Sequence, residues 1–263
     1  MELKAPMPEL EKIRFNGISR LLGEKAQLKI KASHVCVMGI GGVGSWAVEA
    51  LARSGVGAIT LVDMDEVCLS NVNRQIHALD ETVGSSKISV MKERILKINP
   101  DCKVVLIEKF FTKETAEEIL SYNYDYIIDA FDSMWNKLFL IDECVKRKIQ
   151  ICTVGGAGGK SDPTLIRSND LAFTEKDPFC FLMRKNLKRQ YNFTRDKSTP
   201  FGVDCVYSLE EVSYLGEDGE VCQTNGRQDR LKLDCASGLG SASFLTGAFG
   251  FAAAHQAIKR IST

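Results

Sequence analysis

The feature that most restricts the fold is a glycine-rich turn between a short apolar run and a helix-forming stretch. The apolar run 35–38 leads directly into Gly39, Gly41, Gly42 and Gly44, in the order Gly-x-Gly-Gly-x-Gly. Glycines in such a turn let backbone N–H groups approach a phosphate at a helix N-terminus. The helix dipole there favours an anion by about 0.3–2 kcal/mol. The turn therefore predicts a nucleotide-binding α/β domain, although a strand–helix turn without a ligand has the same pattern.

Four more short apolar runs follow, with helix-like stretches between them. The runs are 58–63, 103–107, 125–129 and 150–154. The predicted helices are 45–54, 86–98 and 133–148. Ser45 is expected to be the N-cap of the first helix, and Gly55 to follow its last turn. The alternation predicts an α/β fold: a Rossmann-like, doubly wound, mostly parallel sheet with right-handed crossovers.

The regular alternation stops after Val154. The chain continues with the glycine-rich stretch 155–159, and residues 160–235 form a less regular α+β extension with hairpin-like pieces in 206–222. The stretch 238–261 is apolar and made of small residues interrupted by Ser, Thr and His. It barely reaches the length and apolar content of a membrane span. We expect a buried or dimer-facing helix there, while peripheral membrane contact stays open.

These observations favour a single domain that spans the whole chain, residues 1–263. Residues 35–155 are the predicted nucleotide-binding core, and 156–263 the predicted extension for substrate and dimer contacts.

The composition narrows the possible partners and the compartment. Lys+Arg and Asp+Glu both number 34, so a polyanion would have to bind a local basic patch. The nine cysteines form no C-x-x-C pair, which argues against a tetrathiolate zinc site. Unpaired thiols and the absence of a signal peptide favour the cytoplasm.

A set of charged residues follows the glycine turn and distinguishes between classes of nucleotide-binding enzyme. Asp63 ends the second predicted strand, where an acid can accept hydrogen bonds from ribose hydroxyls. Asp65, Arg74 and Lys87 have no general use in a dehydrogenase, but two cations can neutralise a triphosphate and the charge that develops on its α-phosphate. Asp132 follows the fourth strand, where a carboxylate can hold Mg²⁺ against phosphates.

Together these motifs resemble the ubiquitin-activating-like superfamily, whose bacterial members include the ThiF and MoeB adenylyltransferases. The resemblance covers residues 14 to about 155 and includes Leu-Val-Asp-Met-Asp, Ser-Asn-x-x-Arg-Gln and Asp-Ala-Phe-Asp in family order. It implies that Asp63, Arg74, Lys87 and Asp132 bind ATP and adenylate a carboxylate. It also implies that Asn71 helps to hold the phosphates or the metal.

Two departures narrow the subfamily. Members that activate sulfur carriers usually have two C-x-x-C pairs, and this chain has none. Many members place an arginine that reaches the partner subunit where this chain has Gly17. If another residue supplies that charge, it is Arg14 or Arg20.

The rest of the chain is similar to the tRNA threonylcarbamoyladenosine dehydratases. The similarity includes Asn-Arg-Gln-Ile-His-Ala-Leu at 73–79, Gly-Gly-Ala-Gly-Gly at 155–159 and Asp-Cys-Ala-Ser-Gly at 234–238. It implies ATP-dependent dehydration of threonylcarbamoyladenosine, next to the tRNA anticodon, to its cyclic form. Ring closure within one molecule gains from proximity, so the enzyme needs no nucleophile of its own. Cys235 is the one candidate for a covalent role, against the alternative of a packed thiol.

The resemblance also implies cofactors and partners. ATP and Mg²⁺ are the expected cofactors, and a requirement for a monovalent cation is open. The expected partners are tRNA and a second copy of the chain, with cysteine-desulfurase or sulfur-acceptor proteins as further candidates. The basic segment 184–197 has six Lys/Arg against one Asp, and its Tyr191 and Phe193 could stack on unpaired bases. A solvated amphipathic helix explains the same charges. His34, His77 and His255 are expected to be structural or peripheral.

Three alternatives remain at this stage. The same chemistry could activate the C-terminus of a sulfur-carrier protein, which the missing C-x-x-C pairs disfavour. A non-catalytic scaffold of a sulfur-transfer pathway would not need the charged set. A nicotinamide oxidoreductase would use Asp63 but not the cations.

Overall fold

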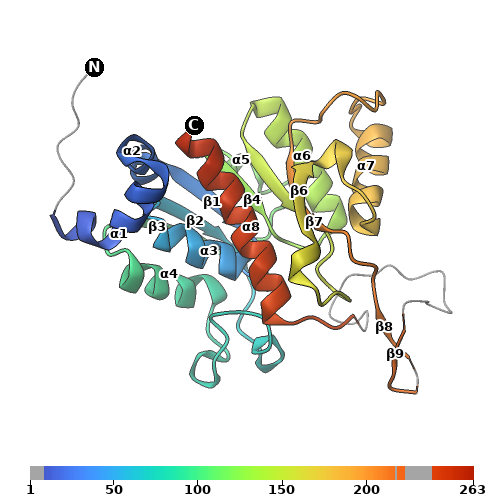
Figure 1. The fold of residues 1–263 in the computed structure, drawn as a ribbon, viewed down its shortest axis with the longest axis horizontal. Helices are drawn as coiled ribbons and strands as arrows, with labels where there is room; N and C mark the ends of the chain where they lie inside the picture. Colours follow the sequence, from blue (N-terminus) through green and yellow to red (C-terminus); the bar gives the residue numbers. More distant parts are fainter. Residues whose placement is uncertain (1–8, 217, 223–238) are drawn as a thin grey trace.

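The computed structural model describes residues 9–216, 218–222 and 239–263 (Figure 1). Its centre is a sheet of seven strands that are parallel except for the last pair. In spatial order the strands are β3 (Lys103–Ile107), β2 (Ala58–Val62), β1 (His34–Met38), β4 (Tyr126–Asp129), β5 (Ile151–Val154), β7 (Asp204–Ser208) and β6 (Ile166–Asp170). The strand order reverses between β1 and β4, which is where open α/β sheets bind ligands at the carboxyl ends of their strands.

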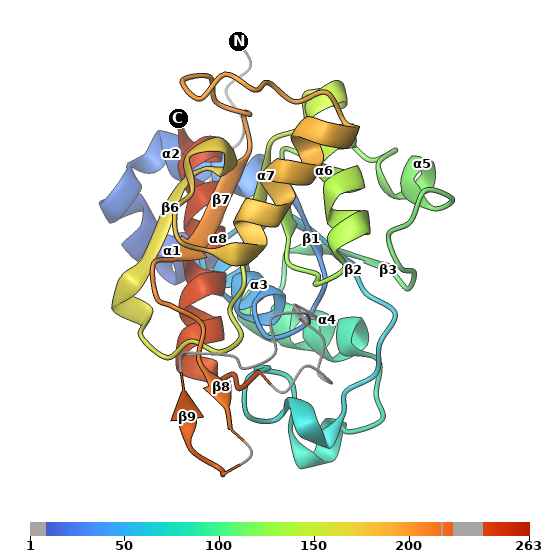
Figure 2. The ribbon, with the colours of Figure 1, turned by 90° about the vertical axis from the view of Figure 1, so that its right-hand side faces the viewer.

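Helices cover both faces of the sheet (Figure 2). One face carries α2 (Glu24–Ala32), α3 (Gly44–Arg53), α4 (Lys87–Ile98) and α8 (Ser243–Ser262), with α1 (Glu9–Leu22) beside α2. The other carries α5 (Ala116–Ile119), α6 (Met134–Arg147) and α7 (Pro178–Gln190). Single 3₁₀ turns are η1 (Leu69–Asn71), η2 (Asp80–Thr82), η3 (Pro163–Leu165) and η4 (Leu171–Phe173). Side chains of β1 alternate between two cores, with Val35 and Val37 in one and Cys36 and Met38 in the other.

The predicted Rossmann-like fold is confirmed, and the five predicted strands match β1 to β5 within one residue at each end. The apolar runs were sufficient to locate these strands, because strands that are covered on both faces are continuously apolar. The predicted N-cap Ser45 is wrong. The helix α3 begins at Gly44 with Val43 as its N-cap, and Ser45 is buried inside the first turn. Gly55 follows the helix in the left-handed conformation, with φ of +80°, as predicted.

The extension after Val154 is more regular than predicted, because two of its strands complete the central sheet. The predicted hairpin region 206–222 is wrong in its first part, since residues 206–208 belong to β7 between β5 and β6. The actual small hairpin pairs β8 (Tyr214–Leu215) with β9 (Val221–Cys222).

The C-terminal helix α8 lies across α3 and the middle of the sheet, as Figure 1 shows. Its Leu245 and Phe249 are fully buried, which confirms the expected buried helix. Gly250 allows the close approach, because a Cβ atom there would lie 2.5 Å from the Val43 carbonyl oxygen. In the described part of the chain, no helix has the length and apolar character needed to cross a membrane.

Candidate functional site

A cleft of about 1100 Å³ opens at the carboxyl ends of the central strands. Its walls contain all but one of the residues predicted to bind the nucleotide: Gly39, Gly41, Gly42, Asp63, Asp65, Asn71, Arg74, Lys87 and Asp132. The fold thus brings together residues that lie up to 93 positions apart, from 39 to 132, at the point where the strand order reverses.

Glycine stands at the positions of this turn for different structural reasons. Gly39 has φ of +87°, and a Cβ atom there would lie 2.7 Å from the Phe131 backbone nitrogen. Gly44, the one predicted residue outside the cleft lining, packs so closely that a Cβ would lie 1.8 Å from the Gly39 carbonyl oxygen. Gly41 faces open space, where the nearest atom to a Cβ is Gln75 Nε2 at 3.9 Å. Gly39 and Gly44 therefore shape the turn, while Gly41 leaves room for a ligand.

Asp63 organises the same turn from the end of β2. Its Oδ2 accepts a hydrogen bond from the Ile40 backbone N–H at 2.6 Å, and its Oδ1 accepts one from the Asp65 N–H at 2.8 Å. A carboxylate has about four acceptor positions, so capacity remains for a ribose hydroxyl.

His77 also supports the turn, from outside the cleft. Its Nε2 lies 2.8 Å from the Ile40 carbonyl oxygen, a geometry that requires the Nε2–H tautomer. Burial lowers the pKa of this imidazole, although the bond to Ile40 opposes the shift. His77 is therefore a structural, neutral histidine at pH 7, as predicted.

The two predicted cations both line the cleft, and each is held by hydrogen bonds. Lys87, at the start of α4, pairs with Asp65 at 2.7 Å. Arg74 Nη1 donates to the Ser70 carbonyl oxygen at 2.7 Å and to Asn73 Oδ1 at 2.9 Å. These contacts hold both positive charges in the cleft that Gly41 and Gly42 also line.

Arg74 is also anchored through its backbone. Its carbonyl oxygen accepts hydrogen bonds from Trp46 Nε1 at 3.0 Å and from Thr246 Oγ1 at 3.2 Å. Thr246 lies on α8, so the C-terminal helix supports the cleft directly. No local sequence pattern predicts this contact, because Arg74 and Thr246 lie 172 positions apart in the chain.

Asn71 and Asp132 differ in how firmly they are held. Asn71 is buried, and its Oδ1 accepts from the Cys68 N–H at 3.0 Å. Asp132 is exposed in the loop between β4 and α6, within the cleft. Among the described residues, no group of three or more metal-ligating side chains comes together. A cation here would thus need the phosphates themselves as ligands, which is the usual mode for Mg²⁺.

A buried ion pair below the Asp132 loop was missed by the sequence reasoning. Lys137 Nζ lies 2.7 Å from Asp129 Oδ1, and both side chains are fully buried. Thr153 Oγ1 donates to Asp129 Oδ2 at 2.7 Å. Asp129 ends β4 and Lys137 lies in the first turns of α6, so the pair fastens both ends of the loop that carries Asp132. A lysine on the apolar face of a predicted helix was the available signal.

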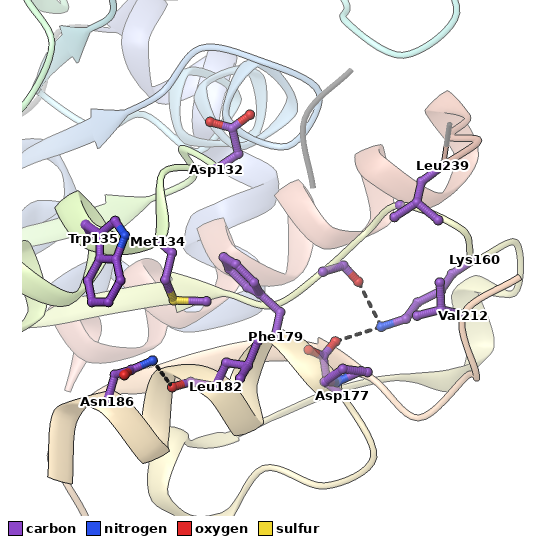
Figure 3. A pocket seen from close by; sticks show the side chains of 13 residues that line it. Asp132, Met134, Trp135, Lys160, Asp177, Phe179, Leu182, Asn186, Val212 and Leu239 are labelled. Carbon is purple, nitrogen blue, oxygen red and sulfur yellow. Dashed lines mark hydrogen bonds and ion pairs between the residues drawn. The ribbon is translucent and has the colours of Figure 1, made fainter. Parts of the chain in front are cut away.

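A second cavity of about 260 Å³ adjoins the cleft (Figure 3). Its lining comes mainly from the start of α6, from α7 and from the loop after β5, with Val212 and Leu239 from two further segments. It includes Trp135, Phe179, Leu182, Lys160 and Asp177. It shares Asp132, Gly156, Gly158, Phe179 and Leu239 with the larger cleft. The sequence indicates the glycines but not this cavity, because its walls come from five separate segments of the chain.

Other predicted residues lie elsewhere. Arg20 is exposed on α1 and lines neither cavity, and Cys235 lies outside the described residues. Tyr191 and Phe193, the predicted candidates for base stacking, are only partly exposed. They are half-buried against the core under α7, and Phe193 packs edge-to-face on Phe201 at 5.0 Å between ring centroids.

Comparison with known proteins agrees with this geometry. The sequence profile of the ThiF family matches residues 16–263. The chain is 48% identical over 249 residues to the tRNA threonylcarbamoyladenosine dehydratase of Escherichia coli K12, covering 94% of this chain and 93% of that protein. The crystal structure of the E. coli tRNA N6-threonylcarbamoyladenosine dehydratase TcdA in complex with ATP superimposes with a TM-score of 0.86 at 43% identity, covering 98% of this chain and 97% of that one.

A more distant relative belongs to the adenylyltransferases. A probable molybdopterin-synthase adenylyltransferase from Porphyra purpurea is 38% identical over 128 residues, which cover 48% of this chain and 33% of that protein.

Proposed function

This chain belongs to the ThiF family and, within it, to the tRNA threonylcarbamoyladenosine dehydratases, and from that premise we propose its reaction. The protein uses ATP to dehydrate threonylcarbamoyladenosine next to the tRNA anticodon and so forms the cyclic derivative. The observation that carries this proposal is the placement of Arg74, Lys87 and Asp132 around one cleft beside the glycine turn.

The chemistry proceeds in two steps. An oxygen of the substrate carboxylate attacks the α-phosphorus of ATP, and the bond to the bridging oxygen breaks, so that pyrophosphate leaves with that electron pair. The product is an acyl-adenylate. A nitrogen or oxygen of the same modification then attacks the acyl carbon, AMP leaves, and the attacking group loses its proton. The net change in the nucleoside is the loss of one water, and the ring closure is favoured by proximity.

Each site residue has one role in this scheme. Backbone N–H groups around Gly41 bind phosphate, and Asp63 accepts from the ribose while it holds the turn. Arg74 and Lys87 stabilise the negative charge that develops on the α-phosphate, and removing one such preorganised donor costs about 10²–10³ in rate. Asn71 keeps the segment that carries Arg74 in its turn.

Mg²⁺ fits the site through Asp132. This carboxylate lines the cleft and accepts no hydrogen bond that would hold it elsewhere in the described residues, and Mg²⁺ is commonly held by one or two carboxylates plus substrate phosphates. The bound ion would neutralise phosphate charge. Whether a monovalent cation is also needed is a separate question for the same assay.

The partners follow from the same proposal. The basic face of α7, with Lys185 and Arg189 exposed, is the tRNA surface nearest the second cavity. The extension 156–263 supplies this face and the surface for a second copy of the chain, into whose cleft Arg20 reaches. The eight described cysteines are free thiols, which supports a cytoplasmic location. Proteins of a cysteine-desulfurase pathway are further candidate partners.

No observation favours the alternatives. A sulfur-carrier adenylyltransferase would be expected to have C-x-x-C pairs, and the match to such enzymes covers half of the chain. Arg74 and Lys87 line the same cleft, and a scaffold without activity would not need them there. A nicotinamide oxidoreductase would have no use for these two cations either.

The test combines two measurements on the full chain. Mass spectrometry of nucleosides from tRNA incubated with ATP and the protein should show the threonylcarbamoyl nucleoside losing one water. Arg74→Ala and Asp132→Ala should each abolish ATP–pyrophosphate exchange without changing the circular dichroism spectrum. Unchanged exchange in both variants would reject the assignment of the site, and an adenylate on a Gly-Gly-ending carrier protein would favour the alternative.

A further inference from the structure

We propose that the smaller cavity binds the base of the substrate nucleoside, with Trp135 as the residue on which that base stacks. This inference rests on the proposed function, and it names the part of the chain that recognises the substrate. The occupant is a purine that has left its stack in the anticodon loop, which is how proteins usually read single-stranded RNA.

The position of the cavity suits such a substrate. It meets the nucleotide cleft at Asp132 and Phe179, so a ligand can extend from one into the other. The substrate carboxylate must reach the α-phosphate, and it is joined to the adenine by a short threonylcarbamoyl arm. A base in the smaller cavity and a carboxylate in the cleft therefore satisfy both requirements with one molecule.

The size of the cavity favours a single base. Pockets that bind drug-sized ligands measure about 300–1,000 Å³. The volume here is about 260 Å³, which suits a purine ring better than a whole nucleoside with its sugar. The sugar and the neighbouring nucleotides would then remain outside, next to the basic face of α7.

The walls of the cavity are those of a stacking site. Figure 3 shows Trp135 and Met134 on one side, with Phe179 and Leu182 between them and the Lys160 side. Trp135 is 59% exposed, so its ring contributes little to the core, whereas Phe179 is 8% exposed and fixed in place. An exposed tryptophan at the mouth of an apolar cavity offers a π-face to any unstacked base.

The opposite end of the cavity is fixed by a buried ion pair. Lys160 is fully buried, with its Nζ 2.7 Å from Asp177 Oδ2 and 2.8 Å from the Gly156 carbonyl oxygen. Neither side chain is exposed to the cavity, so the ion pair fixes the wall at this end and offers no donor to the ligand. The cavity thus offers an exposed aromatic face at one end and a wall fixed by a buried ion pair at the other.

Tryptophan fluorescence and steady-state kinetics test the proposal together. The chain has two tryptophans, so each variant at position 135 leaves one tryptophan fluorophore in place. Trp135→Phe keeps an aromatic ring at this position, whereas Trp135→Ala removes the ring as well as the indole fluorescence. Free N6-threonylcarbamoyladenosine should quench the fluorescence of the wild type and of the control Tyr122→Ala, an exposed aromatic that lines neither cavity. It should not quench Trp135→Phe.

In the dehydration assay, Trp135→Ala should raise the KM for tRNA about tenfold or more, as expected from loss of one stacked base. Trp135→Phe should keep KM within about threefold, and the Kd for ATP should be unchanged in both. The proposal fails if Trp135→Ala leaves the KM for tRNA within twofold of the wild type, or if quenching persists in Trp135→Phe. If the wild type does not dehydrate tRNA, the proposed function is wrong. The fluorescence titration with the free nucleoside needs no turnover, so it tests the base-binding cavity separately.

Discussion

Lys87 Nζ lies 2.7 Å from Asp65 Oδ2, and the two partners differ in exposure: the lysine side chain is 8% exposed and the aspartate side chain 53%. The lysine is therefore fixed in the wall of the cleft, whereas its carboxylate partner is free to turn toward solvent. An arriving triphosphate can replace Asp65 as the partner of the ammonium without moving it. The pair holds the cation in place before the nucleotide binds.

Replacement of this lysine separates catalysis from stability. Lys87→Met should lower the rate of ATP–pyrophosphate exchange about 10²–10³-fold, because one preorganised positive charge is lost. The free energy of unfolding should change by no more than about 1 kcal/mol, because the Asp65 left behind is solvated. Exchange assays and urea unfolding measure the two effects. Lys97→Met, on the exposed side of the same helix, is the matched control. An equal loss of exchange rate in the two variants would contradict the assignment of Lys87 to the ATP site.

Two glycines of the turn should respond differently to alanine. Gly41→Ala should fold normally, since its added methyl group meets no atom closer than 3.9 Å, but should weaken ATP binding by filling the space for a phosphate. Gly39→Ala should lower the melting temperature, because it combines a clash at 2.7 Å with φ of +87°. Isothermal titration with ATP and thermal unfolding distinguish them. Normal ATP affinity in Gly41→Ala would show that the phosphates lie elsewhere.

The buried pair of Lys137 and Asp129 should matter for stability more than any surface pair. Lys137→Met leaves a buried carboxylate without its partner, which costs about 3–5 kcal/mol. The double variant Lys137→Met/Asp129→Leu should recover most of that loss, because no buried charge remains. Urea denaturation measures both. Lys109→Met, which breaks an exposed pair with Glu118, should cost about 1 kcal/mol or less. A loss in the Lys137 variant as small as this would mean that the pair is not buried in solution.

The neutral state of His77 predicts a pH dependence. Burial lowers the pKa of this imidazole below its ordinary value of 6.5, so below pH 6.5 the unfolded chain binds a proton that the folded chain does not. The stability from this group is present above pH 6.5 and falls as the pH drops, with a slope of at most about 1.4 kcal/mol per pH unit.

His77→Gln, which keeps a donor for the Ile40 carbonyl oxygen, tests this dependence. In urea titrations, the unfolding free energy of this variant should fall less between pH 7 and pH 5.5 than that of the wild type. An identical pH profile in the variant and the wild type would mean that His77 is protonated in the folded state.

The sequence predicted those parts of the fold that depend on local patterns. The strands from Val35 to Val154 are continuous apolar runs, and the glycine spacing is a property of the six consecutive residues 39–44. Ser45 was misplaced because a good capping residue lies one position inside a helix that begins at Gly44. The hairpin was extended too far because a strand such as β7, between two others, has no sequence feature that separates it from a hairpin arm.

The candidate site was predictable for a similar reason. Asp63 and Asp132 directly follow strands, and parallel strands bring their carboxyl ends to one edge. The residues that were missed depend on contacts across the chain. Lys160 and Asp177 lie on different segments, as do Arg74 and Thr246, and nothing in the local sequence of either pair indicates the other.

The bond between Thr246 and the Arg74 carbonyl oxygen spans 172 positions of the chain. During synthesis on the ribosome, the glycine turn and both cations emerge long before α8 can pack behind them. A nascent chain therefore has the bond from Trp46 to this carbonyl oxygen but lacks the one from Thr246 until the last helix has been made and docked. The order of translation thus leaves the wall of the cleft that carries Arg74 incomplete until the end of the chain has been made.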